Sequence, residues 1–184
     1  MDLVSIVGLG IGLIVVGTIA GAGIICSGLT GYIATGTESL SPTGAIKGNA
    51  LVVYDPGVTG AAKNASIEIA NDLKSNGYNV TVAGVSSAAA TNTSEYDLII
   101  AGGPMYFGKV SNSIDKYLKT LTLSQDAKLG VFGTTGAAEF SNEDISSLSK
   151  QVTSLQSKNA AIKTLRNGNA TSIDCTDFVS TLMK

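Results

Sequence analysis

The sequence predicts an α/β protein whose parallel sheet is covered by helices on both faces. From residue 50 onward, short and continuous apolar runs alternate with segments in which apolar residues recur every three or four positions. Continuous apolar runs are typical of strands buried on both faces, which is the situation in a parallel sheet. The predicted order β-α-β-β-α-β-α-β-α places one helix between most consecutive strands, so a single doubly wound domain over residues 50–184 is expected.

Residues 3–29 contain no charged side chain. As a helix they would be about 40 Å long, more than the roughly 30 Å of a bilayer's hydrocarbon core, so we predict a transmembrane helix over residues 1–29 that contacts membrane lipid. The alternative is a cleaved secretory signal, but such a signal has a basic start and a shorter apolar region. A lipoprotein signal is disfavoured because Ile25, not a small residue, precedes Cys26.

Two glycine pairs in this segment, Gly8 with Gly12 and Gly17 with Gly21, have the spacing that lets helix backbones approach closely in lipid. They suggest a homodimer or docking to another membrane subunit, and a lipid-facing helix that merely contains glycine is the alternative. Residues 30–49 are rich in Gly, Thr and Ser and are predicted to be a flexible linker. We expect a single-pass protein whose domain faces the cytoplasm.

The first predicted strand, 50–54, leads through the loop 55–60 into a helix ending at Asn76. The inner face of this helix is predicted to consist of Ala62, Ala65, Ile69 and Leu73, and Gly77 is the expected glycine at its C-terminal end. A loop that opens a helix presents unpaired N–H groups to an anion, so this loop is a candidate phosphate site; an ordinary βα turn is the alternative. A second strand is predicted at 79–83.

The segment 96–121 carries the most informative pattern. Residues 98–101 are predicted to be a buried strand that ends at Gly102-Gly103-Pro104, where we expect the chain to turn. An amphipathic helix follows with Ser111 as its N-cap, and its buried residues are expected to be Val110, Ile114, Tyr117, Leu118 and Leu121.

Two further strand and helix pairs complete the domain. Residues 128–132 form a predicted strand that ends in the loop 133–137, and Ser141 with Asp144 resembles a capping box. A weaker strand is predicted at 160–165, and Asp174 is predicted to cap the last helix. The buried positions expected on these two helices are Ile145, Leu148, Val152 and Leu155, then Cys175, Phe178, Val179 and Leu182.

Composition excludes several functions. The net charge is −2, so the chain lacks the basic character of a nucleic-acid-binding protein. The absence of histidine excludes a Ser-His-Asp triad, a Cys-His pair and histidine-ligated metal, and we expect no metal site and no catalytic side chain of these kinds. Cys26 and Cys175 lie too far apart in sequence and setting to indicate a disulfide framework.

Residues 50–184 resemble the flavodoxin-like proteins. The resemblance rests on a strand followed by Thr59-Gly60, on the segment from Tyr96 to Gly108 that reads YDLII with Pro, Tyr, Phe and Gly following, and on the VFGT segment at 131–134. It implies a five-stranded parallel sheet of order 2-1-3-4-5 with flavin mononucleotide (FMN) at the switch point between the first and third strands. The implied contacts are Gly57, Val58, Thr59, Gly60, Ala61 and Ala62 for the phosphate, and Pro104, Met105, Tyr106, Phe107, Gly108, Gly133, Thr134, Thr135 and Gly136 for the ring.

The phosphate loop departs from the family pattern because Gly57 and Ala62 stand where hydroxyl residues are usual. Two lost hydrogen bonds to a charged acceptor would weaken FMN binding by about two to four decades. Gly57→Ser or Ala62→Thr is therefore expected to tighten binding, provided that Gly57 does not need a positive φ. We further expect Tyr106 to lie on the flavin ring and Phe107 to pack in the interior.

Three functions remain open. The first is a membrane-tethered electron carrier that binds FMN and exchanges electrons with a membrane redox partner. The second is a flavin-dependent oxidoreductase acting on a quinone or porphyrin. The third is a flavodoxin fold without cofactor that serves as a membrane-complex subunit. We favour the electron-transfer flavoprotein over an enzyme that converts a substrate.

Overall fold

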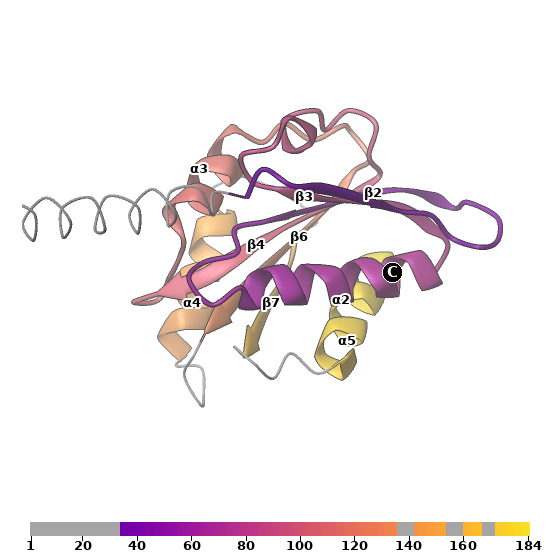
Figure 1. Ribbon diagram of the computed structural model, residues 1–184. Helices are drawn as coiled ribbons and strands as arrows, with labels where there is room; N and C mark the ends of the chain where they lie inside the picture. The colour runs from indigo at the N-terminus through magenta and orange to yellow at the C-terminus, as the bar shows by residue number, and fades with distance from the viewer. Residues whose placement is uncertain (1–33, 136–141, 154–159, 167–171) are drawn as a thin grey trace, which may run out of the picture. The chain divides into compact units, whose positions relative to one another are not determined.

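The computed structural model of the chain describes residues 34–135, 142–153, 160–166 and 172–184 (Figure 1). The predicted transmembrane helix, with Cys26 and the glycine pairs, lies outside these residues. Within the described ranges, no helix is both long and apolar enough to cross a bilayer.

Six strands form the main sheet in the order β1-β3-β2-β4-β6-β7, and a seventh, β5, pairs with β4 off this path. In chain order the elements are β1 (Thr37–Leu40), β2 (Gly48–Tyr54), α2 (Ala61–Ser75), β3 (Tyr78–Gly84), the short 3-10 helix η1 (Ala88–Ala90), β4 (Leu98–Tyr106), β5 (Lys109–Val110), α3 (Asn112–Thr120), β6 (Lys128–Thr135), α4 (Asn142–Thr153), β7 (Ala160–Arg166) and α5 (Ser172–Met183).

The parallel part of the sheet is confirmed. Strands β3, β2, β4, β6 and β7 are parallel and follow the predicted order 2-1-3-4-5. Residues on β2 pair in register with both neighbours, so that Val52 lies between Val82 of β3 and Ile100 of β4. Because β2 and β4 are adjacent while the chain passes through β3 between them, the topological switch point lies at their carboxyl ends.

We had expected a purely parallel sheet. The sheet is mixed instead, because β1 adds an antiparallel edge strand. Thr37 pairs with Ala83 and Leu40 with Val80. The pairing begins earlier still, since Gly84 N–H donates to the Gly36 carbonyl at 2.8 Å and Ser86 N–H to the Ala34 carbonyl at 3.0 Å. This strand lies within residues 30–49, so the expectation of a flexible linker does not hold for it.

Helices cover both faces of the sheet, as predicted. Helices α2 and α5 lie together against one face (Figure 1), where Thr176 Oγ1 donates to Asp72 Oδ2 at 2.9 Å. The buried side chains of this layer include Ala62, Ala65, Ile69, Leu73, Cys175, Phe178, Val179 and Leu182 from the helices and Val52, Ile100 and Phe132 from the strands. The opposite layer includes Ile114, Leu118 and Leu148 from the helices and Leu51, Val53, Ile99 and Val131 from the strands.

Strand β4 is longer than predicted and does not turn at Gly102. It continues to Tyr106, with Gly102 paired to Phe132, Gly103 to Gly133 and Pro104 to Thr134. The glycines serve packing, because a Cβ on Gly102 would lie 2.3 Å from the Phe132 ring. Pro104 is tolerated because β2 pairs with β4 only as far as Gly102, so the strand has a free edge beyond it.

Helix boundaries differ in detail from the prediction. Helix α2 ends as expected before Gly77, whose φ is 96°. Helix α3 begins after Ser111, although the Ser111 hydroxyl makes no capping hydrogen bond. Helix α5 begins at Ser172, so Asp174 lies inside the helix and is not its cap. The proposed cap Ser141 and the predicted buried residue Leu155 lie outside the described residues.

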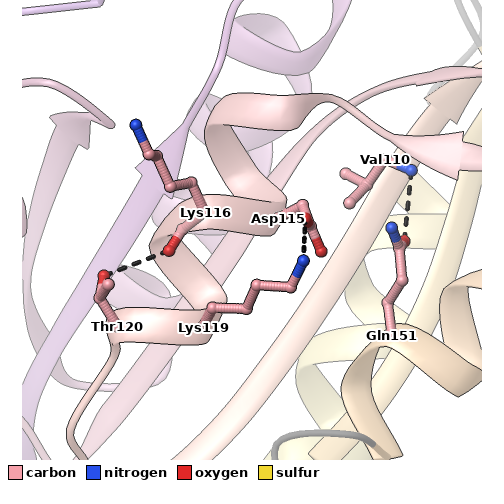
Figure 2. A network of polar contacts seen from close by, with 6 residues as sticks. All are labelled: Val110, Asp115, Lys116, Lys119, Thr120 and Gln151. Carbon is pink, nitrogen blue, oxygen red and sulfur yellow. Dashed lines mark hydrogen bonds and ion pairs between the residues drawn. The ribbon is translucent and has the colours of Figure 1, made fainter.

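Helix α3 and the hairpin before it are joined to α4 (Figure 2). The side-chain carbonyl of Gln151 accepts the Val110 N–H at 3.3 Å, so α4 holds the returning strand β5 in place. On α3 itself, Lys119 and Asp115 form an ion pair of 2.6 Å across one helical turn, and the Thr120 hydroxyl donates to the Lys116 carbonyl at 3.2 Å. These contacts fix the segment that follows the end of β4.

Replacement of Tyr117 by phenylalanine should stabilise the fold. The Tyr117 hydroxyl is buried without a hydrogen-bond partner, and its removal should raise the free energy of unfolding by about 1 kcal/mol in urea titrations. Burial, assisted by nearby Tyr96, raises the pKa of Tyr117 above its ordinary value of 10.0. The unfolded chain therefore releases this proton first as the pH rises above about 10, and the wild type loses stability there that the variant keeps. An equal alkaline loss in both proteins would contradict this.

Candidate functional site

Two loops meet at the carboxyl ends of β2 and β4, where ligands bind in doubly wound sheets. The first, residues 55–60, joins β2 to α2, and the second is the tight turn Phe107-Gly108 between β4 and β5. Gly57 of the first loop lies against the last part of β4, just before the turn, because a Cβ on Gly57 would lie 2.7 Å from the Pro104 ring. The structure thus brings the predicted phosphate loop and the predicted ring loop together.

The first loop delivers the N-terminus of α2, whose N-cap residue has no side chain to cap the first turn. The N-cap residue Gly60 has a φ of 74° and makes no side-chain cap, and no acidic residue lies in the first turn. A long contact reaches this turn, from the Ala61 N–H to Thr59 Oγ1 at 3.4 Å. Such a terminus carries partial positive charge and can accept an anion.

Asp55 is the residue of this loop that sequence reasoning missed. Its Oδ1 accepts the Gly57 N–H at 3.0 Å, and its Oδ2 accepts a short hydrogen bond from the hydroxyl of Ser113 on α3. The half-buried carboxylate therefore occupies one amide of the loop and adds a negative charge to the candidate anion site. The order Asp-Pro-Gly could have indicated this, since an aspartate that bonds the N–H two residues on is a recognised turn signal.

The structure places two of the predicted phosphate contacts in structural roles. Ala62 is 1% exposed and belongs to the core beneath α2, so a hydroxyl there would enter the core and not the phosphate site. Gly57 has a φ of 61° and packs on Pro104. The condition attached to the Gly57→Ser expectation therefore fails, and neither hydroxyl substitution is now expected to tighten FMN binding.

Gly57→Ala should destabilise the fold more than Gly60→Ala. Both glycines have positive φ, which costs an L-residue about 1–2 kcal/mol, but a Cβ at position 60 has nothing within 4 Å. At position 57 the clash with Pro104 should bring the loss in unfolding free energy to about 2–4 kcal/mol. Urea titration of both variants measures the difference, and equal losses would show that Pro104 does not confine the loop.

The ring loop is more exposed than predicted. Tyr106 is 48% exposed, and Phe107 is fully exposed at 105% with a φ of 50°. The expectation that Phe107 packs in the interior is wrong, because the tight turn to β5 points its side chain outward. Met105 instead fills the interior, where it lies against Gly133 of β6.

The third predicted loop contributes less. Gly133, Thr134 and Thr135 belong to β6, and Thr134 is only 3% exposed beside Pro104 in the sheet. Gly136 lies outside the described residues. Among the described residues, no group of three His, Cys, Asp or Glu side chains could hold a metal ion.

Asp97 of the YDLII segment has a structural role at the other end of the sheet. Its carboxylate accepts the Asn49 N–H at 2.8 Å, and its own N–H donates to the Asn49 carbonyl at 2.9 Å. The Lys128 N–H donates to the Asp97 carbonyl at 3.0 Å, so this residue joins the starts of three strands.

The fold is flavodoxin-like. The structure is similar to a short-chain flavodoxin associated with a PDU bacterial microcompartment, with a TM-score of 0.56, 16% identity and coverage of 73% of this chain and 96% of that one. It is similar to a flavodoxin of Streptococcus pneumoniae TIGR4, with a TM-score of 0.52, 17% identity and coverage of 73% and 97%.

A flavodiiron protein shares the fold as one part of a longer chain. The flavodiiron core of Flv1 from Synechocystis sp. PCC6803 matches with a TM-score of 0.53 and 18% identity over 77% of this chain, which spans 37% of that core. No protein-family model matches the chain, and no curated protein matches it. At these identities, the likeness establishes the fold and leaves function to the site.

Proposed function

We propose that this chain is a membrane-tethered electron-transfer protein that binds FMN. The observation that carries the proposal is the contact between Gly57 and Pro104, which joins an uncapped helix N-terminus to an exposed aromatic loop at the switch point. A helix N-terminus suits a phosphate, and an aromatic beside it suits a flat ring. The solved structures of like fold include flavodoxins, which supports the same proposal.

The residues present fit the cofactor in most respects. The N–H groups from Val58 to Ala61 would hold the phosphate, and the exposed Tyr106 would lie against the ring and exclude water from it. Bound FMN supplies the redox chemistry, so the chain needs no catalytic histidine or cysteine. Asp55 is the feature that opposes the phosphate, and it lowers the affinity that we expect.

The tether is the second part of the proposal. Residues 3–29 lack charge and are long enough to span a bilayer, and the described domain starts at Ala34, so few residues separate the two. A membrane-attached carrier would exchange electrons with a partner in or at the same membrane.

Asp55 favours one competing function. The Asp55 carboxylate accepts the Gly57 N–H, which a bound anion would otherwise accept. A fold without cofactor would keep this hydrogen bond because it stabilises the loop. The second candidate is therefore a membrane-complex subunit that binds no flavin.

Titration of FMN and riboflavin into the full chain in detergent decides between them. Binding should quench flavin fluorescence, and FMN should bind more tightly than riboflavin because only FMN carries the phosphate. Tyr106→Ala should weaken both flavins, whereas Ile46→Ala, an exposed apolar residue far from the loops, should weaken neither. If neither flavin binds, the electron-transfer proposal is wrong and the second candidate, a membrane-complex subunit without flavin, remains.

A further inference from the structure

Exposed apolar side chains gather at the two loops of the candidate site. Among the described residues, four large hydrophobic side chains are exposed: Val58 at 79%, Tyr106 at 48%, Phe107 at 105% and Ile46 at 60%. Val58 lies on the first loop, Tyr106 ends β4 and Phe107 opens the turn after it, and we call these three residues the apolar tip. The β4–β5 hairpin that bears two of them projects from the carboxyl end of the sheet, at the left of Figure 1.

Phe107 is the most unusual member of the apolar tip. Within the described part of the chain it is the one residue other than glycine with a positive φ, a conformation that is rare for a bulky side chain. The turn thus holds an aromatic ring fully outside the domain. Lys109, the second residue after it, is also exposed. Segments that bind at a membrane surface combine Phe, which enters the lipid, with Lys, whose charge stays at the headgroups.

The chain enters the domain at the same end of the sheet. Strand β1 is antiparallel to β3, and the Ala34 carbonyl accepts the Ser86 N–H just beyond the carboxyl end of β3. From residue 29 to Ala34 the chain has five steps, which reach at most about 18 Å. Had residues 30–49 all been a linker, the reach would have been about 70 Å. The antiparallel strand therefore shortens the length of chain that can separate residue 29 from this end of the sheet.

The tip is also close to the entry point across the sheet. Strand β1 is separated from β4 by β3 and β2, and three spacings of about 4.8 Å between neighbouring strands amount to about 14 Å. Across the sheet, the strand that carries Tyr106 at its end is therefore about 14 Å from the edge strand at which Ala34 enters.

We propose that the apolar tip docks onto the lipid surface to which residues 3–29 attach the chain, with Phe107 inserted among the lipids and Lys109 at the headgroups. The proposal rests on the membrane attachment proposed above, but not on flavin binding. Docking would turn the meeting point of the two loops toward the bilayer, so the electron-exchange partner would lie in the membrane and not in solution.

Tryptophan fluorescence tests the docking directly, because the chain contains no tryptophan. Phe107→Trp in the full chain, free of flavin, is reconstituted into vesicles of phosphatidylcholine and phosphatidylglycerol with ordinary or brominated acyl chains. We expect blue-shifted emission and about a twofold loss of intensity in brominated lipid, because the ring lies near the acyl chains. Ile46→Trp is the matched control, exposed at the opposite end of the sheet, and its emission should be the same in both lipids.

Val58→Trp provides a second probe that does not alter the strained turn, and it should be quenched in the same lipid. Emission from both tip variants that stays red-shifted and unquenched, in a chain that floats with the vesicles, would overturn the docking and leave the tip to a soluble protein partner. A chain that fails to float would overturn the attachment and the docking together. Quenching in a chain that binds no FMN would support docking while the flavin proposal fails.

Discussion

Asp55→Asn should tighten FMN binding by about ten- to a hundredfold. A unit negative charge about 6 Å from a phosphate charge costs about 3 kcal/mol at an effective dielectric constant of about 20, and solvent screening reduces this. Since about 1.4 kcal/mol corresponds to one decade in affinity, removal of the charge from the half-buried Asp55 should recover one to two decades.

The asparagine substitution isolates charge from geometry. An amide oxygen at position 55 can still accept the Gly57 N–H, so the turn should keep its shape, and the amide nitrogen can donate to the Ser113 hydroxyl. The experiment is FMN titration of the full chain, and riboflavin should gain little because it has no phosphate.

Asp97→Asn is the matched control for the Asp55 variant. It removes the same charge from a carboxylate that also accepts a backbone N–H, but at the amino ends of the strands. Its FMN affinity should therefore remain within about a factor of two of the wild type, because the charge is more than a Debye length away. An affinity for FMN that is unchanged in Asp55→Asn would place the phosphate elsewhere.

The sequence predicts correctly those elements whose apolar residues follow the pattern of burial, periodic in the helices and continuous in the parallel strands. Helix α2 is an example, because Ala62, Ala65, Ile69 and Leu73 recur at helical spacing and all are buried. The parallel strands are recognisable because both faces are covered, which requires continuous apolar runs. For these elements the pattern of burial and the pattern of sequence have the same cause.

Strand β1 could not be found in this way. Its residues, Thr37 to Leu40, are mostly exposed and show no apolar alternation, so the strand is held by backbone pairing with β3. The predicted end of β4 at Gly102 was wrong for a different reason. Gly102 and Gly103 are common in turns, but here they make room for side chains of other elements, which a single sequence does not reveal.

The candidate site also has features that the sequence predicts and features that it does not. The loops and their meeting at the switch point were predictable, because topology fixes where strands end. The direction of Phe107 was not, since an apolar residue is ordinarily expected inside and only the tight turn sends it out. The role of Asp55 was readable from its turn signal but depends on Ser113, which is 58 residues away.

Gly102→Ala should be among the most destabilising single-methyl additions in the domain. The Phe132 ring is fully buried and lies across Gly102, with three ring carbons at 2.3–2.4 Å from the position of an added Cβ. The ring cannot move without displacing its neighbours in the core, so we expect a loss of about 2–4 kcal/mol in unfolding free energy. Urea titration of residues 34–184, which form a compact unit, provides the measurement.

A double-mutant cycle can assign that loss to the ring. Phe132→Leu alone should cost about 1–3 kcal/mol through the cavity it creates, whereas the pair Gly102→Ala with Phe132→Leu should cost less than the sum of the two. Gly44→Ala is the control, because a Cβ there has nothing within 4 Å, and it should leave stability unchanged. Strict additivity in the cycle would mean that Gly102 is required by the strand backbone and not by the aromatic ring that crosses it.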